Sequence, residues 1–290
     1  MNGLETYAVV TPARDEAGHL ARLAGSLAAQ TVRPSRWIVV ENGSGDETMA
    51  VARGLAGELD WMHVVACEPP SRAARGAPVV HAFHAGLAEL DIEVDGVAKV
   101  DADVSFGDEY FERLLAEFRR DPQLGVASGT CHDRLSGSAK ERPVTGDHVW
   151  GAARVYRWSC LQDVLPLEAR MGWDGIDVVK AQTHGWRTAT FRDLPFHHHR
   201  LEGARDGSRW SAWAAQGNAA RFMRYRPSYL LLRSLHRAFR EPAAFAILWG
   251  YLVAASRREP RCGDAAVVAK LRAGQRLRLL PTRAREALGL

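Results

Sequence analysis

Short apolar runs alternate with amphipathic stretches along the first half of the chain. The apolar runs predict strands at residues 7–11, 37–40, 62–66 and 97–100. Leucines on one face predict a helix over 19–30, and similar periodicity predicts helices over 47–58 and 79–90. Strands that alternate with helices at this spacing are typical of an α/β fold with a mostly parallel, doubly wound sheet.

Polar loops follow three of these predicted strands. They read PARDEAG after Thr11, ENGSGDET after Val40 and DADVSF after Val100. A further helix is predicted after Asp108, because four apolar residues there share one face. In open α/β sheets ligands bind beyond the carboxyl ends of the strands, so these loops are the candidate site.

Composition and charge divide the chain in two. Its 290 residues are 47% apolar and 25% charged, which excludes a disordered or fibrous protein. Residues 1–199 carry 20 Lys and Arg against 28 Asp and Glu, whereas residues 200–290 carry 18 against 6. We therefore expect an α/β domain over 1–200 and a basic, amphipathic helical region over 201–290. Four cysteines without a C-x-x-C pair indicate neither a zinc ribbon nor a disulfide scaffold and fit a reducing compartment.

The basic region predicts an anionic partner. The apolar stretch 243–255 is too short to span a bilayer, and cations flank it at Arg233, Arg237, Arg240, Arg257 and Arg258. This pattern favours an anionic membrane surface, the alternative being helices that pack on the first domain with solvated arginines. No nucleic-acid-binding module surrounds the arginines, so nucleic acid is not expected as a partner. With no evident signal peptide, we expect a cytoplasmic protein, peripheral at the inner face of the cell membrane.

Two loop motifs point to chemistry. Asp101 and Asp103, at i and i+2 after an apolar strand, can hold a hard divalent cation, which neutralises a diphosphate leaving group. The sequence Asn42-Gly43-Ser44-Gly45-Asp46 lacks the third glycine of a dinucleotide fingerprint, since Thr48 stands there. It fits a tight turn that hydrogen-bonds a nucleoside, or an ordinary loop in which Asp46 caps a helix.

These motifs together resemble family 2 glycosyltransferases of GT-A fold. VVTPARDEAGHLARLAGSLAAQTVRPSRWIVVENGSGDET matches the opening of that family, and KVDADVSF, Gly172-Trp173-Asp174 and Gly185-Trp186 follow in the family's order. The resemblance implies a nucleoside-diphosphate sugar donor and a Mn²⁺ or Mg²⁺ cofactor. It also implies a nucleoside pocket lined by Pro12, Ala13, Arg14, Glu16, Glu41 and Asn42.

The resemblance extends to the metal and to the diphosphate, with two departures. It implies that Asp101 lies near the ribose or the metal and that Asp103 binds the metal. The family's usual aspartate pair is replaced here by Glu41-Asn42, and its usual glycine-lysine by Arg75-Gly76-Ala77. Arg75 or Arg72 is the candidate replacement for the lysine charge.

The resemblance also supplies candidates for the base and for a third metal ligand. Inverting members place a carboxylate eleven residues before a helix-ending glycine, which here is Gly185, and this implies Asp174 as general base; Asp177, one turn later, is the alternative. Successive side chains on a strand face opposite ways, so the run His197-His198-His199 cannot bind one ion together. We expect His199, and after it His198, as the metal ligand; a histidine bonded to backbone is the alternative.

The function expected from the resemblance is metal-dependent, inverting transfer of a sugar to a hydroxyl acceptor. The acceptor could be lipid-linked, as in the synthesis of glycolipids or cell-surface polysaccharide. A retaining GT-A transferase and a non-catalytic, membrane-bound scaffold of the same fold are the alternatives. A nucleotidyltransferase is disfavoured, since the loop after the first strand has only Arg14 as a cation. A homodimer through the tail stays open.

Overall fold

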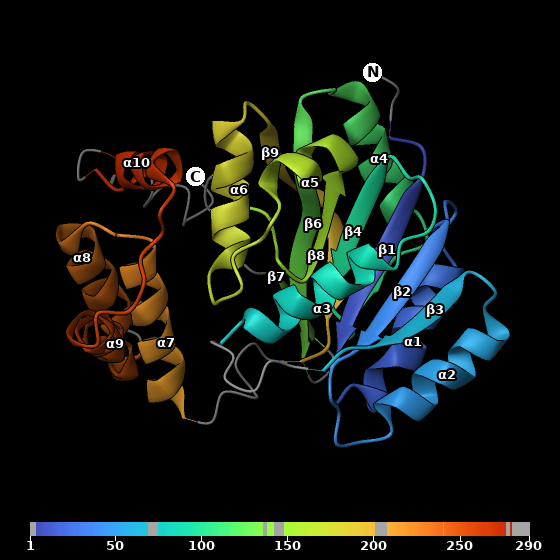
Figure 1. Cartoon of the computed structure of the whole chain (residues 1–290), viewed down its shortest axis with the longest axis horizontal. Coiled ribbons are helices and arrows are strands. Elements are labelled where there is room, and N and C mark those ends of the chain that lie inside the picture. Colours follow the sequence, from blue (N-terminus) through green and yellow to red (C-terminus); the bar gives the residue numbers. More distant parts are fainter. Residues whose placement is uncertain are drawn as a thin grey trace.

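The computed structural model describes residues 4–68, 75–135, 138–141, 148–200, 208–239, 241–276 and 279, without the side chains of 134, 135 and 138–141. Arg72 and Arg240 lie outside the residues described in full, so the predictions made for them stay untested. Figure 1 shows an α/β body, built on one twisted sheet, with a group of helices at one end.

The first four strands form a parallel half-sheet, as the apolar runs predicted. They are β1 (Tyr7–Ala13), β2 (Arg36–Glu41), β3 (Met62–Ala66) and β4 (Gly96–Val100), and they lie in the order β3-β2-β1-β4. Every residue of β1 and β4 is buried, as expected of strands covered on both faces. The helices between them are α1 (Ala17–Ala28), α2 (Thr48–Glu58) and α3 (Ala77–Ala88).

The second half of the sheet is mixed, which the alternating pattern did not predict. Its strands are β5 (Val104–Phe106), β6 (Leu124–Leu135), β7 (Ser138–Glu141), β8 (Ala153–Arg157) and β9 (Arg187–His198). Strand β8 lies between β4 and β6 and runs antiparallel to both, while β9 is parallel to β6 and antiparallel to β5. The α/β fold class is confirmed, with a sheet order that continues β4-β8-β6-β9-β5.

Two apolar cores cover the two faces of the sheet. One joins the sheet to α1, α2 and α4 (Tyr110–Arg120), including the predicted stripe of Phe111, Leu114, Leu115 and Phe118. The other joins it to α3, α5 (Trp158–Val164) and α6 (Trp173–Thr183). Helix α6 thus packs on the sheet with one side, and its opposite side is left for the C-terminal helices (Figure 1).

The C-terminal region is helical, as its composition predicted. It contains α7 (Arg209–Phe222), α8 (Pro227–Ala238), the short helix η1 (Pro242–Phe245), α9 (Ala246–Ser256) and α10 (Ala265–Gly274). An apolar cluster joins Ile176 of α6 to Phe222, Met223 and Val267 of this region. The region is therefore tied to the α/β body through α6. Within the described ranges, we find no helix with both the length and the apolar character needed to cross a membrane.

Candidate active site

The carboxyl ends of β1, β2 and β4 meet at one edge of the sheet, as the polar loops predicted. Ala13 on β1 lies opposite Glu41 on β2, and the Asn42 amide donates to the Ala13 carbonyl at 2.9 Å. On the other side of β1, Val10 lies opposite Lys99 of β4, two residues before Asp101. Strand pairing thus brings the three predicted loops to one place.

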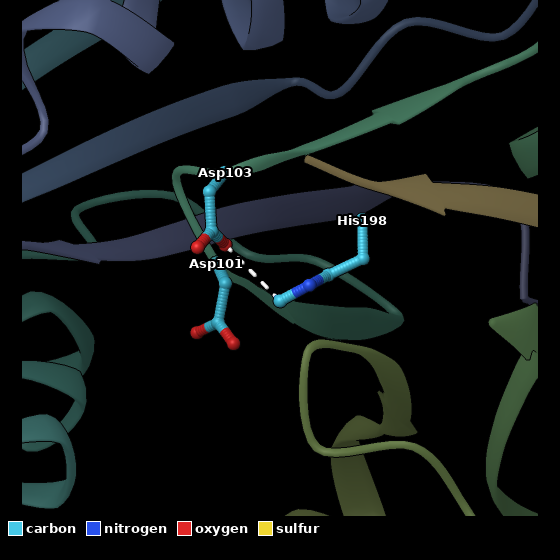
Figure 2. A group of neighbouring side chains, drawn as sticks. All are labelled: Asp101, Asp103 and His198. Carbon is cyan, nitrogen blue, oxygen red and sulfur yellow. Dashed lines mark ion pairs between the residues drawn. The ribbon is translucent and has the colours of Figure 1, made fainter. Parts of the chain in front are cut away.

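Asp101, Asp103 and His198 form a cluster beyond this edge. One ligand atom from each lies within 4.8 Å of the others, and His198 Nε2 is 3.4 Å from Asp103 Oδ1. Figure 2 shows both carboxylates and the imidazole directed toward one small region. Strand pairing explains the placement of the histidine, because Val104 of β5 lies opposite His198 at the end of β9. Carboxylate oxygens with one imidazole nitrogen suit Mn²⁺ or Mg²⁺.

The hydrogen bonds of the two neighbouring histidines differ. His198 Nδ1 contacts the Arg200 carbonyl, which can only accept, so Nδ1 carries a proton and Nε2 is the nitrogen that faces the carboxylates. His199 Nε2 lies 2.8 Å from Ser105 Oγ, and its backbone amide donates to the Asp103 carbonyl at 2.9 Å. The geometry therefore favours His198, the second of the two histidines that the sequence suggested, as the third ligand.

Lys99 partly neutralises the negative charge of this cluster. Its ammonium, almost fully buried, pairs with Asp101 and donates to the Gly151 carbonyl at 2.9 Å. Desolvation raises the pKa of Asp101; the Lys99 charge opposes this, and the nearby Asp103 adds to it. A divalent cation would favour the ionised form of both carboxylates, which fits the concentration of acidic groups here.

Glu16, in the first loop, is connected to this cluster through Arg200. Its carboxylate accepts two hydrogen bonds from the Arg200 guanidinium, at 2.9 and 2.8 Å, and Arg200 also lies 3.7 Å from Asp103. Glu16 is buried, whereas Arg14 is exposed and lies 3.8 Å from Asp15. Arg200 thus links the first loop of the predicted nucleoside pocket to the cluster of Asp101, Asp103 and His198.

Asn42 presents an unsatisfied polar atom at the predicted nucleoside pocket. Its Nδ2 donates to the Pro78 carbonyl at 3.0 Å, while its Oδ1 is buried and has no hydrogen-bond partner among the described residues. A buried acceptor left unpaired costs about 1–3 kcal/mol, so a donor from a bound ligand would be stabilised there. Glu41 differs, because its carboxylate accepts from the Ser44 amide and closes the turn that the sequence predicted.

Two other residues predicted to bind the nucleotide-sugar donor, Pro12 and Arg75, differ in exposure. Pro12 is buried at the end of β1. Arg75 is exposed just before α3, beside Gly76, whose φ of 85° is in the left-handed region. A Cβ at Gly76 would lie 2.7 Å from the Met171 amide nitrogen, so this turn packs on the segment that leads into α6. Arg75 therefore lies beside a turn that packs against the segment before α6.

Asp174 lies in the first turn of α6, beside the loop that Lys99 contacts. A Cβ at Gly151 would lie 3.1 Å from Asp174 Oδ2, so the glycine leaves room in front of this carboxylate. Lys99 donates to the carbonyl of this same Gly151 and also pairs with Asp101. Gly151 therefore lies between Asp174 and the Lys99–Asp101 pair. The candidate base and the candidate metal cluster thus share one edge of the site.

Asp177 has a different environment. It is buried and bonds the guanidinium of Arg154 at 2.5 Å, the hydroxyl of Tyr156 and the backbone amide of Val178. Desolvation raises the pKa of Asp177, and the Arg154 charge opposes it. Both carboxylate oxygens of Asp177 already accept hydrogen bonds from residues of β8 or α6. The geometry therefore favours Asp174 over Asp177 as the base.

Arg154 and Lys99 are two cations of the site that the sequence did not single out. Arg154 donates to the carbonyls of Val149 at 2.6 Å and of Asp174 at 3.2 Å, besides pairing with Asp177. It therefore fixes the start of α6, where Asp174 lies. A signal existed for both, because each is a charged residue between two apolar residues of a strand.

Comparison with solved structures identifies the fold. TarS residues 1–349 from S. aureus match with a TM-score of 0.55 and 19% identity, over 74% of this chain and 64% of that one. The mannosyltransferase PcManGT from Pyrobaculum calidifontis, in complex with GDP-Man and Mn²⁺, matches with a TM-score of 0.57 and 17% identity over 99% of this chain and 85% of that one. GalNAc-T7 with UDP, GalNAc and Mn²⁺ matches with a TM-score of 0.57 and 13% identity, over 76% and 48%. The protein thus has the GT-A glycosyltransferase fold.

A family model matches the first part of the chain. Residues 8–146 match the model of glycosyl transferase family 2, the family that the sequence motifs resemble. A search of curated proteins found no match. The chain spans 64% of TarS 1–349 and 40% of the longer TarS structure.

Proposed function

We propose that this protein is a metal-dependent, inverting glycosyltransferase that moves a sugar from a nucleoside-diphosphate donor to a hydroxyl acceptor. The observation that carries the proposal is the placement of the Asp101, Asp103 and His198 cluster beside Asp174, with Gly151 between them. A family 2 domain and structural neighbours that bind UDP-GlcNAc and GDP-Man support a donor of this class.

The donor would lie along the carboxyl edge of β1, β2 and β4. The buried Oδ1 of Asn42 offers an acceptor for an N–H group of the base, and Pro12 and Ala13 provide an apolar wall. Arg75, exposed directly before α3, would supply a cation for the diphosphate. These roles agree with those that the family resemblance implies.

Asp101, Asp103 and His198 would hold the metal. When bound, Mn²⁺ or Mg²⁺ supplies positive charge for the diphosphate as it leaves. The protein prepares this position by fixing the proton of His198 on Nδ1 and by pairing Asp101 with Lys99. Arg200, close to both Glu16 and Asp103, adds a second cation at the same position.

Asp174 would act as general base. In an inverting transfer the acceptor oxygen attacks the anomeric carbon while its proton passes to a carboxylate, and the bond to the diphosphate breaks on the opposite side. The Asp174 carboxylate is partly exposed above Gly151, and its backbone carbonyl is held by Arg154. A retaining transfer needs no such base on the acceptor side and predicts the other anomer of the product.

Calorimetry on the whole chain tests the metal cluster. UDP and GDP, titrated with and without Mn²⁺, should bind the wild type in a metal-dependent way, and Asp103→Ala should abolish that dependence. The matched control is Asp60→Ala, which should bind nucleotide as the wild type does. Asp60 is an exposed carboxylate just before β3, at the opposite end of that strand from the site. Metal-dependent binding that survives in Asp103→Ala contradicts this site, and no nucleotide binding at all favours a non-catalytic scaffold.

Asp174→Asn tests the base. This variant should bind the donor nucleotide normally and lose about 10²–10⁴-fold in transfer rate, the usual contribution of a general base. Proton NMR of the product, or of the sugar released by water, should show the inverted anomer for the wild type. Retention of configuration, or an unchanged rate in Asp174→Asn, would refute the inverting mechanism proposed here.

A further inference from the structure

Large exposed apolar side chains gather in the C-terminal helices. Among the residues that the structure describes, eight such side chains are found, and all lie between Trp210 and Leu252. Phe239 is 90% exposed, Leu252 63% and Trp249 58%. Exposed apolar residues scattered singly are normal on a protein, so such a concentration on the neighbouring helices α7, α8, η1 and α9 marks an interaction surface.

On α8 these side chains form a stripe. At 3.6 residues per turn, Leu231, Leu232, Leu235 and Phe239 fall within an arc of about 100°. The opposite side of the helix is buried, with Leu230 in an apolar cluster and the Ser234 hydroxyl donating to the Ala244 carbonyl at 3.1 Å. Helix α8 therefore has a second apolar side that no described part of the protein covers.

A matching stripe follows on η1 and α9. Phe245, Trp249 and Leu252 recur at i, i+4 and i+7 and point to one side of the helix. The other side of α9 crosses α7 closely, because a Cβ at Gly250 would lie 1.9 Å from the Ala214 carbonyl oxygen. In Figure 1, α8 and α9 lie on the outer side of the helical region, away from the sheet.

The charges around the two stripes are almost all positive. Neither α8 nor α9 contains an Asp or Glu, while Arg257, Arg258 and Arg261 are exposed after α9. Glu259, within this run, lies 3.9 Å from the Arg170 guanidinium. Glu241, between the two helices, lies 3.8 Å from the Arg209 guanidinium. An apolar stripe with cationic flanks complements a surface that is apolar inside and anionic at its rim.

We propose that the exposed apolar side chains of α8, η1 and α9 form a docking face for an anionic lipid bilayer, into which Phe239, Trp249 and Leu252 insert. A second copy of the chain fits less well, because a symmetric interface would bring two sets of arginines together. Nucleic acid fits less well because it would leave the leucine and phenylalanine stripe uncovered.

Docking would also fix the orientation of the active site. The helical region is joined to α6 by the cluster of Ile176, Phe222, Met223 and Val267, and α6 carries Asp174 in its first turn. If the proposed transfer is correct, the acceptor hydroxyl would then belong to a molecule held at the membrane, such as a lipid-linked sugar.

Vesicle flotation tests this docking face without donor or metal, so its result does not depend on the proposed transferase activity. The full chain is mixed with vesicles of phosphatidylcholine, or of phosphatidylcholine with phosphatidylglycerol in equal amounts. We expect the wild type to float with the anionic vesicles, less so at high salt, and to stay behind with the neutral ones. Absence of binding to anionic vesicles would overturn the proposal.

Two variants and a control separate the contributions. Phe239→Ser, Trp249→Ser and Leu252→Ser combined should lower the affinity for anionic vesicles about tenfold or more. Because each of these side chains is more than half exposed, the melting temperature should change little. Arg257→Gln with Arg258→Gln should weaken binding and make it less salt-dependent, because two of the cations that meet the anionic head groups are removed.

The charge-matched control is Arg22→Gln with Arg53→Gln, on α1 and α2, which should bind vesicles like the wild type. Undiminished flotation of the triple variant contradicts the docking face. The proposal is also contradicted if the wild type sediments as a dimer and the triple variant as a monomer, because a second copy of the chain would then cover this face.

Discussion

Replacement of Arg154 offers the sharpest test of the packing behind the candidate base. Its side chain and that of Asp177 are 0% and 1% exposed and form a direct ion pair. Arg154→Met keeps much of the apolar volume but leaves the Asp177 carboxylate buried without a cation. Breaking a buried pair in this way costs about 3–5 kcal/mol of unfolding free energy, a large share of the roughly 5–15 kcal/mol that stabilises a typical domain.

The pH dependence of this variant has a defined sign. Desolvation raises the pKa of Asp177, and removal of Arg154 takes away the main opposing charge. A carboxyl with a raised pKa in the folded state binds its proton more readily there than in the unfolded chain. The stability deficit of Arg154→Met should therefore be smallest at low pH and should grow as the pH rises through the raised pKa.

Urea unfolding followed by tryptophan fluorescence measures both effects, since the chain has nine tryptophans. The double variant Arg154→Met with Asp177→Leu removes both charges and should recover most of the stability, because an apolar replacement of a buried pair is often neutral or better. A loss of less than about 1 kcal/mol in the single variant would refute the reasoning, since that is the value of a solvated pair. A double variant no more stable than the single one would refute it too.

Two further predictions concern the crossing of α7 with α9 and the start of α2. Gly217→Val should loosen the crossing, because a Cβ at residue 217 would lie 2.0 Å from the Ile247 carbonyl oxygen. Limited proteolysis should then cut the C-terminal helices faster in the variant than in the wild type. Equal rates of cleavage would contradict the close approach of the two helices. The hydrogen bond from Thr48 lowers the pKa of Asp46, so Asp46 stabilises the fold above the ordinary carboxyl pKa of about 3.9 and loses this effect as the pH falls. The difference in melting temperature between wild type and Asp46→Ala should accordingly shrink below about pH 4, and a constant difference would argue against this role.

The sequence alone determined the parallel half of the fold and the position of the three polar loops. Strands β1 to β4 are short apolar runs between helices with clear periodicity, and such local patterns need no knowledge of distant partners. Because parallel strands end at the same edge, the strand pattern by itself predicted one region for the loops that hold Glu16, Glu41, Asn42, Asp101 and Asp103. The pairing of β1 with β2 and β4, and the contacts of Arg200 with Glu16 and Asp103, place these loops together. The family motifs pointed to the same region.

Tertiary structure decided what depends on pairing between distant segments. The insertion of β8 between β4 and β6 places Arg154 under α6, and the pairing of β5 with β9 selects His198 rather than His199 for the cluster. Neither choice can be made from spacing, because a shift of one residue along a strand turns the side chain to the other face. The exposed stripe of α8 likewise becomes visible only once the buried side of that helix is known, since the neighbouring leucines Leu230 and Leu231 are buried and exposed, respectively.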